Sequence, residues 1–186
     1  DVSATKSRAL AQTWGPEDGS PVFTVAGRYQ SRGWTEWTQG FQFGSPLLQF
    51  DATGEAEFLD LGRSRTIERM ASHLTHTGVH DHGFNNVSTY GNLWRLAREG
   101  RIHADAWEMR SYELALKVTG AVQAHRRTPL ADGRFTHSFH GPHSLFVAAN
   151  PPLRALAPAP LLGHHPLRAP ERAAARPPPP LPPPQT

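Results

Sequence analysis

The stretch His80-Asp81-His82-Gly83-Phe84-Asn85-Asn86 decides how the fold of this chain is interpreted. It places one carboxylate between two imidazoles, and a glycine, an aromatic ring and two amides follow. The segments on either side, about 55–74 and 86–98, carry apolar residues at helical spacing. The stretch therefore predicts a polar turn between two helices. Because each of these groups would need a hydrogen-bond partner inside an apolar core, we expect the turn to be an active-site element.

Helical periodicity extends over most of residues 34–125. The predicted helices cover about 37–53, 55–74, 86–98 and 106–125, and residues 7–14 form a further short one. Thr53-Gly54 is a C-terminal signal, Asp105 with Glu108 resembles a capping box, and Pro46 is expected to kink or break its helix. Strand signals are minor: a brief strand at 22–25, and an extended piece at 134–140 after a turn at 132–133. We predict an all-α fold built of helical hairpins.

The predicted helices also predict which apolar side chains are buried. In the segment 55–74 the expected stripe is Phe58, Leu61, Ile67, Met70 and Leu74. In the segment 106–125 it is Trp107, Tyr112, Ala115, Leu116, Thr119 and Val122.

Composition excludes several classes of protein. The chain has 186 residues, a net charge of +3 with 11 histidines, and no cysteine, which excludes disulfides, thiolate metal sites and a cysteine nucleophile. Its late arginines are scattered, so we expect no nucleic-acid partner. No apolar run is long enough to cross a bilayer, and we expect no membrane partner. No signal peptide is visible, so we expect a cytoplasmic protein, although a chain starting at Asp1 without methionine can lack an upstream signal.

Three regions differ in character. Residues 1–33 form a mixed N-terminal segment, residues 34–150 carry the helical pattern, and residues 151–186 hold 13 of the 18 prolines. The last region lacks the apolar residues needed to order itself, so we expect a disordered polyproline II tail. Such a tail is either a ligand for SH3 or WW domains or an unselected extension.

Four pieces of the chain carry a resemblance to a known family. They are Trp37-Thr38-Gln39-Gly40-Phe41, Asp51-Ala52-Thr53-Gly54-Glu55, His80-Asp81-His82-Gly83-Phe84 and Gly141-Pro142-His143-Ser144-Leu145-Phe146-Val147. With these pieces the chain resembles the N-terminal portion of glycoside hydrolase family 88, the unsaturated uronyl hydrolases. The resemblance implies an incomplete (α/α)6 barrel that comprises its first two or three helical hairpins.

The resemblance also implies a substrate and a chemistry. Enzymes of this family hydrate the C4–C5 double bond of an unsaturated uronic acid at the non-reducing end of lyase-derived oligosaccharides, without a cofactor or a metal. Asp81 matches a catalytic aspartate that contacts the substrate and supports the acid, and His80 matches a substrate-contacting histidine. Trp37 matches a sugar-stacking position, and Asn85 and His82 are further candidates for substrate contact.

A second aspartate, the family's principal acid/base, is expected just after Phe146-Val147. Ala148 and Ala149 follow instead, and alanine has no proton to donate. We therefore expect this chain to be weakly active or inactive.

Other interpretations of the same residues stay open. Asp81 can be a helix N-cap, and His80 and His82 can be exposed loop residues. The histidines at 73, 76, 80 and 82 suggest a zinc hydrolase, although Gly78 interrupts them and no H-E-x-x-H arrangement is present. A non-enzymatic helical binding or scaffold module with a Pro-rich docking tail is the main alternative. The oligomeric state is not set by the sequence.

Overall fold

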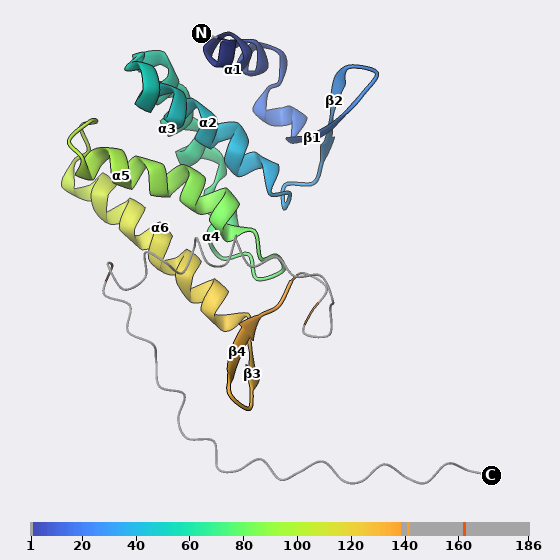
Figure 1. Ribbon diagram of the computed structural model, residues 1–186. Coiled ribbons are helices and arrows are strands. Elements are labelled where there is room, and N and C mark those ends of the chain that lie inside the picture. Colours follow the sequence, from blue (N-terminus) through green and yellow to red (C-terminus); the bar gives the residue numbers. More distant parts are fainter. Residues whose placement is uncertain (1, 139–140, 142–161, 163–186) are drawn as a thin grey trace.

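The computed structural model describes residues 2–138, 141 and 162, and this part of the chain is mostly helical (Figure 1). The elements in chain order are α1 (Val2–Thr13), η1 (Pro16–Asp18), β1 (Ser20–Val25), β2 (Arg28–Arg32), α2 (Thr38–Thr53), α3 (Ala56–Arg69), α4 (Ala71–Leu74), η2 (Gly83–Gly91), α5 (Asn92–Arg98), α6 (Ala106–His125), β3 (Arg127–Leu130) and β4 (Gly133–Thr136). Apart from Leu162, the proline-rich region predicted to be disordered lies outside the described residues, and so does Ala148.

The predicted helix ends are confirmed where local chemistry sets them. α2 ends at Gly54, which takes a left-handed φ of 74° and donates its N–H to the Phe50 carbonyl at 2.7 Å. α6 begins at Asp105, whose carboxylate accepts the backbone N–H groups of Trp107 and Glu108 at 2.7 and 2.8 Å. The Glu108 carboxylate accepts the Asp105 N–H in return at 3.0 Å, which completes the predicted capping box. Pro46 does not break α2, which continues to Thr53.

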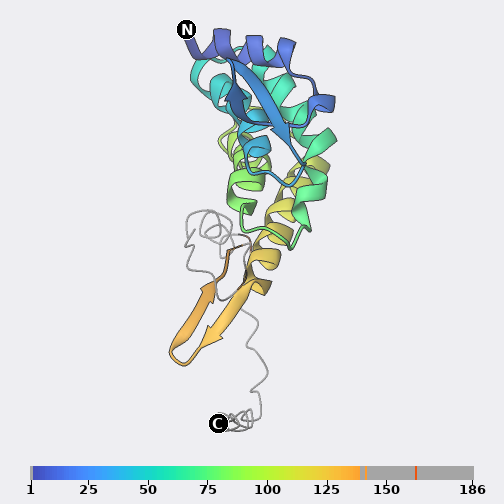
Figure 2. The same cartoon turned by 90° about the vertical axis from the view of Figure 1, so that its right-hand side faces the viewer.

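The all-α prediction is correct only in part, because two antiparallel hairpins accompany the helices. β1 pairs with β2 around Ala26 and Gly27, whose φ angles of 48° and 74° suit a tight hairpin turn. β3 pairs with β4 and places Leu130 opposite Gly133. The strand signal of β3 is weak because Pro129 removes a backbone donor from a four-residue strand. The hairpins lie toward opposite ends of the helical body (Figure 2).

The segment after the polar turn is wound as a π-helix. η2 covers nine residues, whereas an α-helix was expected from about Asn86 onward. Long π-helices are rare, and short π-helical turns occur often at functional sites. Six of its nine residues are buried, and they include Asn85, Asn86, Ser88 and Thr89. η2 therefore brings polar side chains into the interior directly after Asp81.

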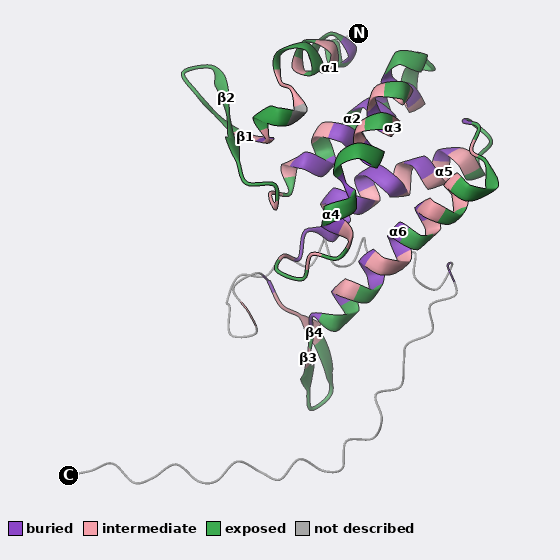
Figure 3. Cartoon of the chain, turned by 180° about the vertical axis from the view of Figure 1, so that it is seen from behind, coloured by how far each residue is buried: buried purple, intermediate pink, exposed green. Residues whose placement is uncertain are grey.

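The core lies between α2, α3, η2, α5 and α6 (Figure 3). Its buried members include Phe43, Leu47, Phe50, Phe58, Met70, Tyr90, Leu93, Leu96, Tyr112 and Ala115. The predicted buried stripes are correct at Phe58, Met70 and Tyr112 but wrong at Ile67 and Trp107, which are 55% and 77% exposed. Both face away from the helices that cover the rest of their stripes, so an apolar residue at helical spacing did not ensure burial here.

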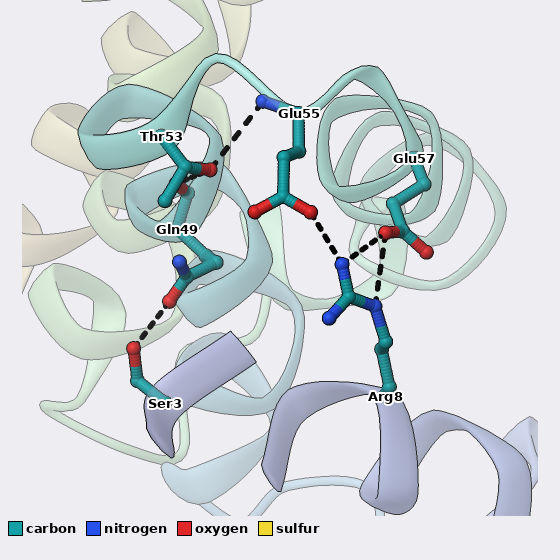
Figure 4. A network of polar contacts seen from close by, with 6 residues as sticks. All are labelled: Ser3, Arg8, Gln49, Thr53, Glu55 and Glu57. Carbon is teal, nitrogen blue, oxygen red and sulfur yellow. Dashed lines mark hydrogen bonds and ion pairs between the residues drawn. The ribbon is translucent and has the colours of Figure 1, made fainter. Parts of the chain in front are cut away.

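α1 is attached to the α2–α3 hairpin by polar contacts (Figure 4). Ser3 Oγ donates to Gln49 Oε1 at 2.5 Å. The Arg8 guanidinium contacts the carboxylates of Glu55 and Glu57, and Arg8 Nε lies 2.9 Å from Glu57 Oε1. Ala4 is the one residue of α1 that is buried. These contacts are mostly exposed, so we expect each ion pair to contribute little to stability.

Asp51 has the structural role that its place near a helix end suggests. Its carboxylate accepts from Arg95 at 2.6 Å and also contacts the Arg101 guanidinium. Arg101 donates to the Asp51 backbone carbonyl as well, at 2.7 Å. Asp51 therefore connects the end of α2 to α5 and to the loop after it.

None of the described helices combines the length and the apolar character that a membrane span needs.

Candidate functional site

Asp81 ends the loop between α4 and η2 and starts the π-helix with its backbone. Its carbonyl accepts the N–H groups of Phe84 and Asn85 at 2.9 and 3.0 Å. No side-chain cap is present at the start of η2. The carboxylate instead lies against the preceding residue, with Oδ1 at 3.5 Å from His80 Nε2. The N-cap interpretation of the Asp81 side chain is therefore not supported, and its carboxylate is placed beside an imidazole.

The polar turn is buried, contrary to the expectation that such groups are hard to place in the interior. His80 is 3% exposed, Asp81 8% and His82 1%, so the exposed-loop interpretation of both histidines is wrong. Asn85 and Asn86, at the start of η2, are buried as well. Burial of this kind requires partners, and the neighbouring elements supply several of them, although Asn86 Oδ1 has none among the described residues.

His82 and Asn86 belong to one buried hydrogen-bond network. His82 Nε2 lies 2.6 Å from the His76 carbonyl, and its Nδ1 lies 3.2 Å from Asn86 Nδ2. The same Asn86 amide donates to the His73 carbonyl at 3.3 Å. Burial lowers the pKa of His82 and favours the neutral imidazole. Both ring nitrogens of His82 thus have partners within the protein, and this side chain connects the loop at His76 to Asn86 on η2.

His73 forms a second link, from α4 to the start of α2. Its Nε2 lies 2.6 Å from Gln39 Oε1, and the indole ring of Trp34 lies edge-on at 5.4 Å between centroids. Burial lowers the pKa of His73 to about 4, with smaller contributions from His82 and His76. The imidazole is therefore neutral near pH 7 and acts as a hydrogen-bonding core residue.

Burial changes the proton affinity of Asp81 in the opposite direction. Together with a smaller contribution from the carboxylate of Glu36, it raises the pKa of the carboxyl group to about 6. The guanidinium of Arg126 lowers it. A carboxyl group with this pKa exists in both protonation states near neutral pH, which is the property that a general acid or base needs.

Three aromatic rings lie together where the start of α2 meets the start of η2. Trp37 lies 5.7 Å from both Phe41 and Phe84, and Phe41 lies 5.3 Å from Phe84, measured between ring centroids. Trp37 is 42% exposed and Phe41 36%, so both present ring surface to solvent. Phe84 follows Asp81 by three residues on η2. The W-T-x-G-F piece and the H-D-x-G-F piece therefore meet in space, as their common assignment to one site predicts.

Gly40 lets these two pieces approach each other. A Cβ at this position would lie 2.2 Å from the Phe84 carbonyl oxygen and 2.3 Å from Asn85 Cα. Its N–H donates to Asn85 Oδ1 at 3.0 Å, so this oxygen of Asn85 is used inside the protein. One turn later Gly44 packs against the backbone of Ser88 in the same way. The two glycines make a smooth face on α2, and η2 lies directly against it.

Sequence reasoning did not select Glu36, Phe84 or Arg126 as site residues. Phe84 and Glu36 could have been selected from the sequence, because Phe84 lies in a quoted motif and Glu36 directly precedes one. Arg126 belongs to no motif, and its electrostatic interaction with Asp81, 45 positions away, follows only from the packing of α6.

In the described part of the chain no group of three or more His, Asp or Glu side chains could hold a metal ion. The histidines at 73, 76, 80 and 82 are instead distributed among separate contacts.

Comparisons of the chain with models of protein families, with curated proteins and with solved structures found no match. The functional proposal therefore rests on the quoted motif residues and on the geometry of Asp81, His80 and the aromatic rings.

Proposed function

We propose that this chain is the N-terminal portion of a carbohydrate hydrolase similar to the unsaturated uronyl hydrolases, and that it binds the unsaturated uronic acid end of an oligosaccharide. The observation that carries the proposal is the Asp81 carboxyl group, with a pKa of about 6, beside His80, on the same motif as Phe84, whose ring lies against those of Trp37 and Phe41. Protein sites for sugars commonly combine an aromatic face for the C–H face of the ring with polar groups for the hydroxyls.

Each residue has a stated role in this proposal. Trp37 stacks on the sugar ring, and the His80 imidazole contacts the sugar's polar edge. Asp81 binds the sugar and supports proton transfer to C4, since its raised pKa keeps part of the population protonated near neutral pH. Asn85 and His82, buried and bonded within the protein, hold η2 and the loop in place around Asp81.

The chemistry attached to this site is hydration of the C4–C5 double bond. A proton is added at C4, positive charge develops toward C5 and the ring oxygen, and water adds at C5. The resulting hemiketal opens and releases the sugar. A second carboxyl group is expected to carry most of the proton transfer, and Ala148 stands where it is expected. We therefore propose that the chain binds saccharide and has weak or no turnover.

The helical pairing is compatible with an incomplete (α/α)6 barrel. α2 packs on α3 and on η2, and α5 with η2 packs on α6, so that successive helices form neighbouring pairs. The exposed Trp107 and Leu114 on α6, at 77% and 61%, are apolar positions that a further helix would cover in a complete barrel.

The test is calorimetric titration of the full chain with unsaturated uronic acid disaccharides, with the ultraviolet absorbance of their double bond followed in parallel. Asp81→Asn, His80→Gln and Trp37→Leu are each expected to weaken binding at least about tenfold, which corresponds to about 1.4 kcal/mol. Trp107→Leu is the matched control, because this indole is 77% exposed on α6 and is expected to leave binding unchanged.

Two results would contradict the proposal. The first is the absence of saccharide binding by folded protein. The second is binding that all three site variants retain. If, in addition, removal of residues 151–186 abolished capture of an SH3 or WW domain, the scaffold function with a docking tail would replace the enzyme-like one.

A further inference from the structure

A pocket lies between α1 and the α2–α3 hairpin, and none of residues 80–86 lines it. Its volume is about 70 Å³, which is room for more than a single water molecule, and it opens to solvent. Each of the three helices contributes side chains about one turn apart. They include Ser7 and Leu10 on α1, Phe41 and Ser45 on α2, and Leu61 and Arg65 on α3.

The pocket exists because α1 packs incompletely on the hairpin. Polar contacts of Ser3 and Arg8 hold α1 against α2 and α3 (Figure 4), and Ala4 is its one buried residue. Farther along α1, Leu10 faces the pocket and stays half-buried, and so does Leu61 on α3, which the helical pattern predicted to be buried. Protein interiors are normally close-packed, so apolar side chains left half-covered around a pocket favour an apolar occupant.

The polar groups of the wall favour an anion. The hydroxyls of Ser7 and Ser45, the amide of Gln42 and the guanidinium of Arg65 can all donate hydrogen bonds. Arg65 is the one charged residue among the described residues that line the pocket, and none of these is acidic. An apolar wall with donors and a single cation suits a molecule that has an apolar body and one carboxylate.

Arg65 keeps donors for such a ligand. Its Nη1 lies 2.8 Å from Glu68 Oε2, three residues later on α3. The two side chains are 33% and 51% exposed, so this ion pair is weak and is readily exchanged for a better acceptor. A guanidinium also has further donors beyond the one that Nη1 directs to Glu68. Glu68 therefore competes with a bound carboxylate without closing the pocket.

We propose that the pocket between α1, α2 and α3 binds a small carboxylate with an apolar body, of about the size of an aryl carboxylate. The apolar body packs against Leu10, Phe41 and Leu61, and the carboxylate accepts from Arg65. The ring of Phe41 also lies 5.7 Å from that of Trp37, so an occupant changes the surroundings of the exposed aromatic rings. This site goes beyond the proposed saccharide site and does not depend on it.

The experiment is an NMR titration of backbone amides in the full chain with three probes near pH 7. Benzoate has both the ring and the carboxylate, benzyl alcohol has the ring without the charge, and acetate has the charge without the ring. We expect benzoate to shift the amide resonances of residues 7–11, 41–46 and 61–65 with a Kd of about 1 mM. We expect benzyl alcohol to bind at least about fivefold more weakly and acetate to leave these resonances unchanged.

Three variants on α3 test the role of the charge. Arg65→Gln is expected to weaken benzoate binding at least about fivefold, and Glu68→Gln to strengthen it, because the competing carboxylate is gone. Arg69→Gln is the matched control, since Arg69 is exposed one turn later on the same helix and does not line the pocket. We expect it to leave binding unchanged.

The proposal is overturned if benzoate shifts no resonances in these three ranges, or if Arg69→Gln weakens binding as much as Arg65→Gln does. Equal binding of benzyl alcohol and benzoate would show an apolar pocket without recognition of the carboxylate, which also overturns it. If Arg65→Gln does not fold, Glu68→Gln decides, and benzoate binding that it fails to strengthen counts against the proposal. Saccharide binding at Asp81 is measured separately, and neither result decides the other.

Discussion

The backbone N–H of Gly40 donates to the side-chain oxygen of Asn85, 45 positions later, at 3.0 Å. This bond joins α2 to η2, the two elements that carry Phe41 and Phe84. It is possible only because residue 40 has no side chain, since a Cβ would overlap the backbone of residues 84 and 85. The W-T-x-G-F piece therefore needs its glycine for packing, and the position of the aromatic residues follows from that packing.

Gly40→Ala is expected to destabilise the protein strongly. Its Cβ would lie 2.2 Å from the Phe84 carbonyl oxygen, so the two helices must separate or distort. We expect a loss of about 3 kcal/mol or more in the free energy of unfolding, measured by urea denaturation. Gly133→Ala is the control, because nothing lies within 4 Å of a Cβ there, and it is expected to be nearly neutral. Equal stability of the two variants would contradict the close packing of α2 on η2.

Asn85→Ala tests whether this amide serves the fold or the ligand. Removal of its side chain leaves the buried Gly40 N–H without an acceptor, which costs about 1–3 kcal/mol of stability. We expect that loss in urea denaturation, with saccharide affinity changed less than by Asp81→Asn. Asn92→Ala is the comparison, because the Asn92 amide donates to a carbonyl four residues earlier, at 2.8 Å, and is only partly buried. A large loss of saccharide affinity in a stable Asn85→Ala protein would instead assign Asn85 to substrate contact, as the sequence analysis expected.

Local chemistry explains which parts of the fold could be predicted. The capping box of Asp105 and Glu108 and the left-handed Gly54 involve residues within four positions of each other, and both were predicted correctly. Burial of Trp107 was wrongly predicted, because the sequence pattern does not show which helix faces are covered. β3 was missed because pairing with β4, rather than its own composition, makes it a strand.

The candidate site shows the same limit. Asp81 and His80 could be selected from their motif, and the meeting of Trp37 with Phe84 agrees with that selection. The burial of the polar residues around them could not be predicted, because it depends on long-range partners such as Gln39 for His73 and Gly40 for Asn85. The pKa of Asp81 depends on Glu36 and Arg126, which no motif connects to it.

Acid is expected to destabilise the protein through His73. Its pKa is about 4 in the folded protein and 6.5 in the reference state, so the unfolded chain binds a proton first as the pH falls. Stability is fully present above about pH 6.5 and is lost between 6.5 and 4, by about 3 kcal/mol for this group. We expect His73→Gln to show a smaller loss over this range in urea denaturation.

Two controls make the His73 result specific. His125→Gln, at an exposed position in the last turn of α6, is expected to leave the slope of stability against pH unchanged. The series is measured in the Asp81→Asn background, because Asp81 contributes a slope of opposite sign in the same range. A slope that His73→Gln does not reduce would contradict the neutral buried imidazole.

Asp81→Asn is expected to stabilise the protein at alkaline pH while it weakens saccharide binding. Burial raises the pKa of Asp81 from 3.8 to about 6, so the folded state holds its proton more tightly than the unfolded chain does. The cost of the buried charge is therefore absent below about pH 4, grows as the pH rises, and is complete above about pH 6, where it reaches about 2–3 kcal/mol. An uncharged asparagine of similar shape avoids that cost.

The measurement is urea denaturation of wild type and Asp81→Asn at a series of pH values from about 4 to 8. We expect the two midpoints to coincide at the acid end and to separate in favour of Asp81→Asn as the pH rises through 6. Asp51→Asn is the matched control with the opposite sign, because Asp51 accepts from Arg95 at 2.6 Å and the substitution removes the negative charge that both Arg95 and Arg101 contact. If Asp81→Asn lowered stability at every pH as Asp51→Asn does, Asp81 would be a structural carboxylate, and its place in a saccharide site would lose its physical basis.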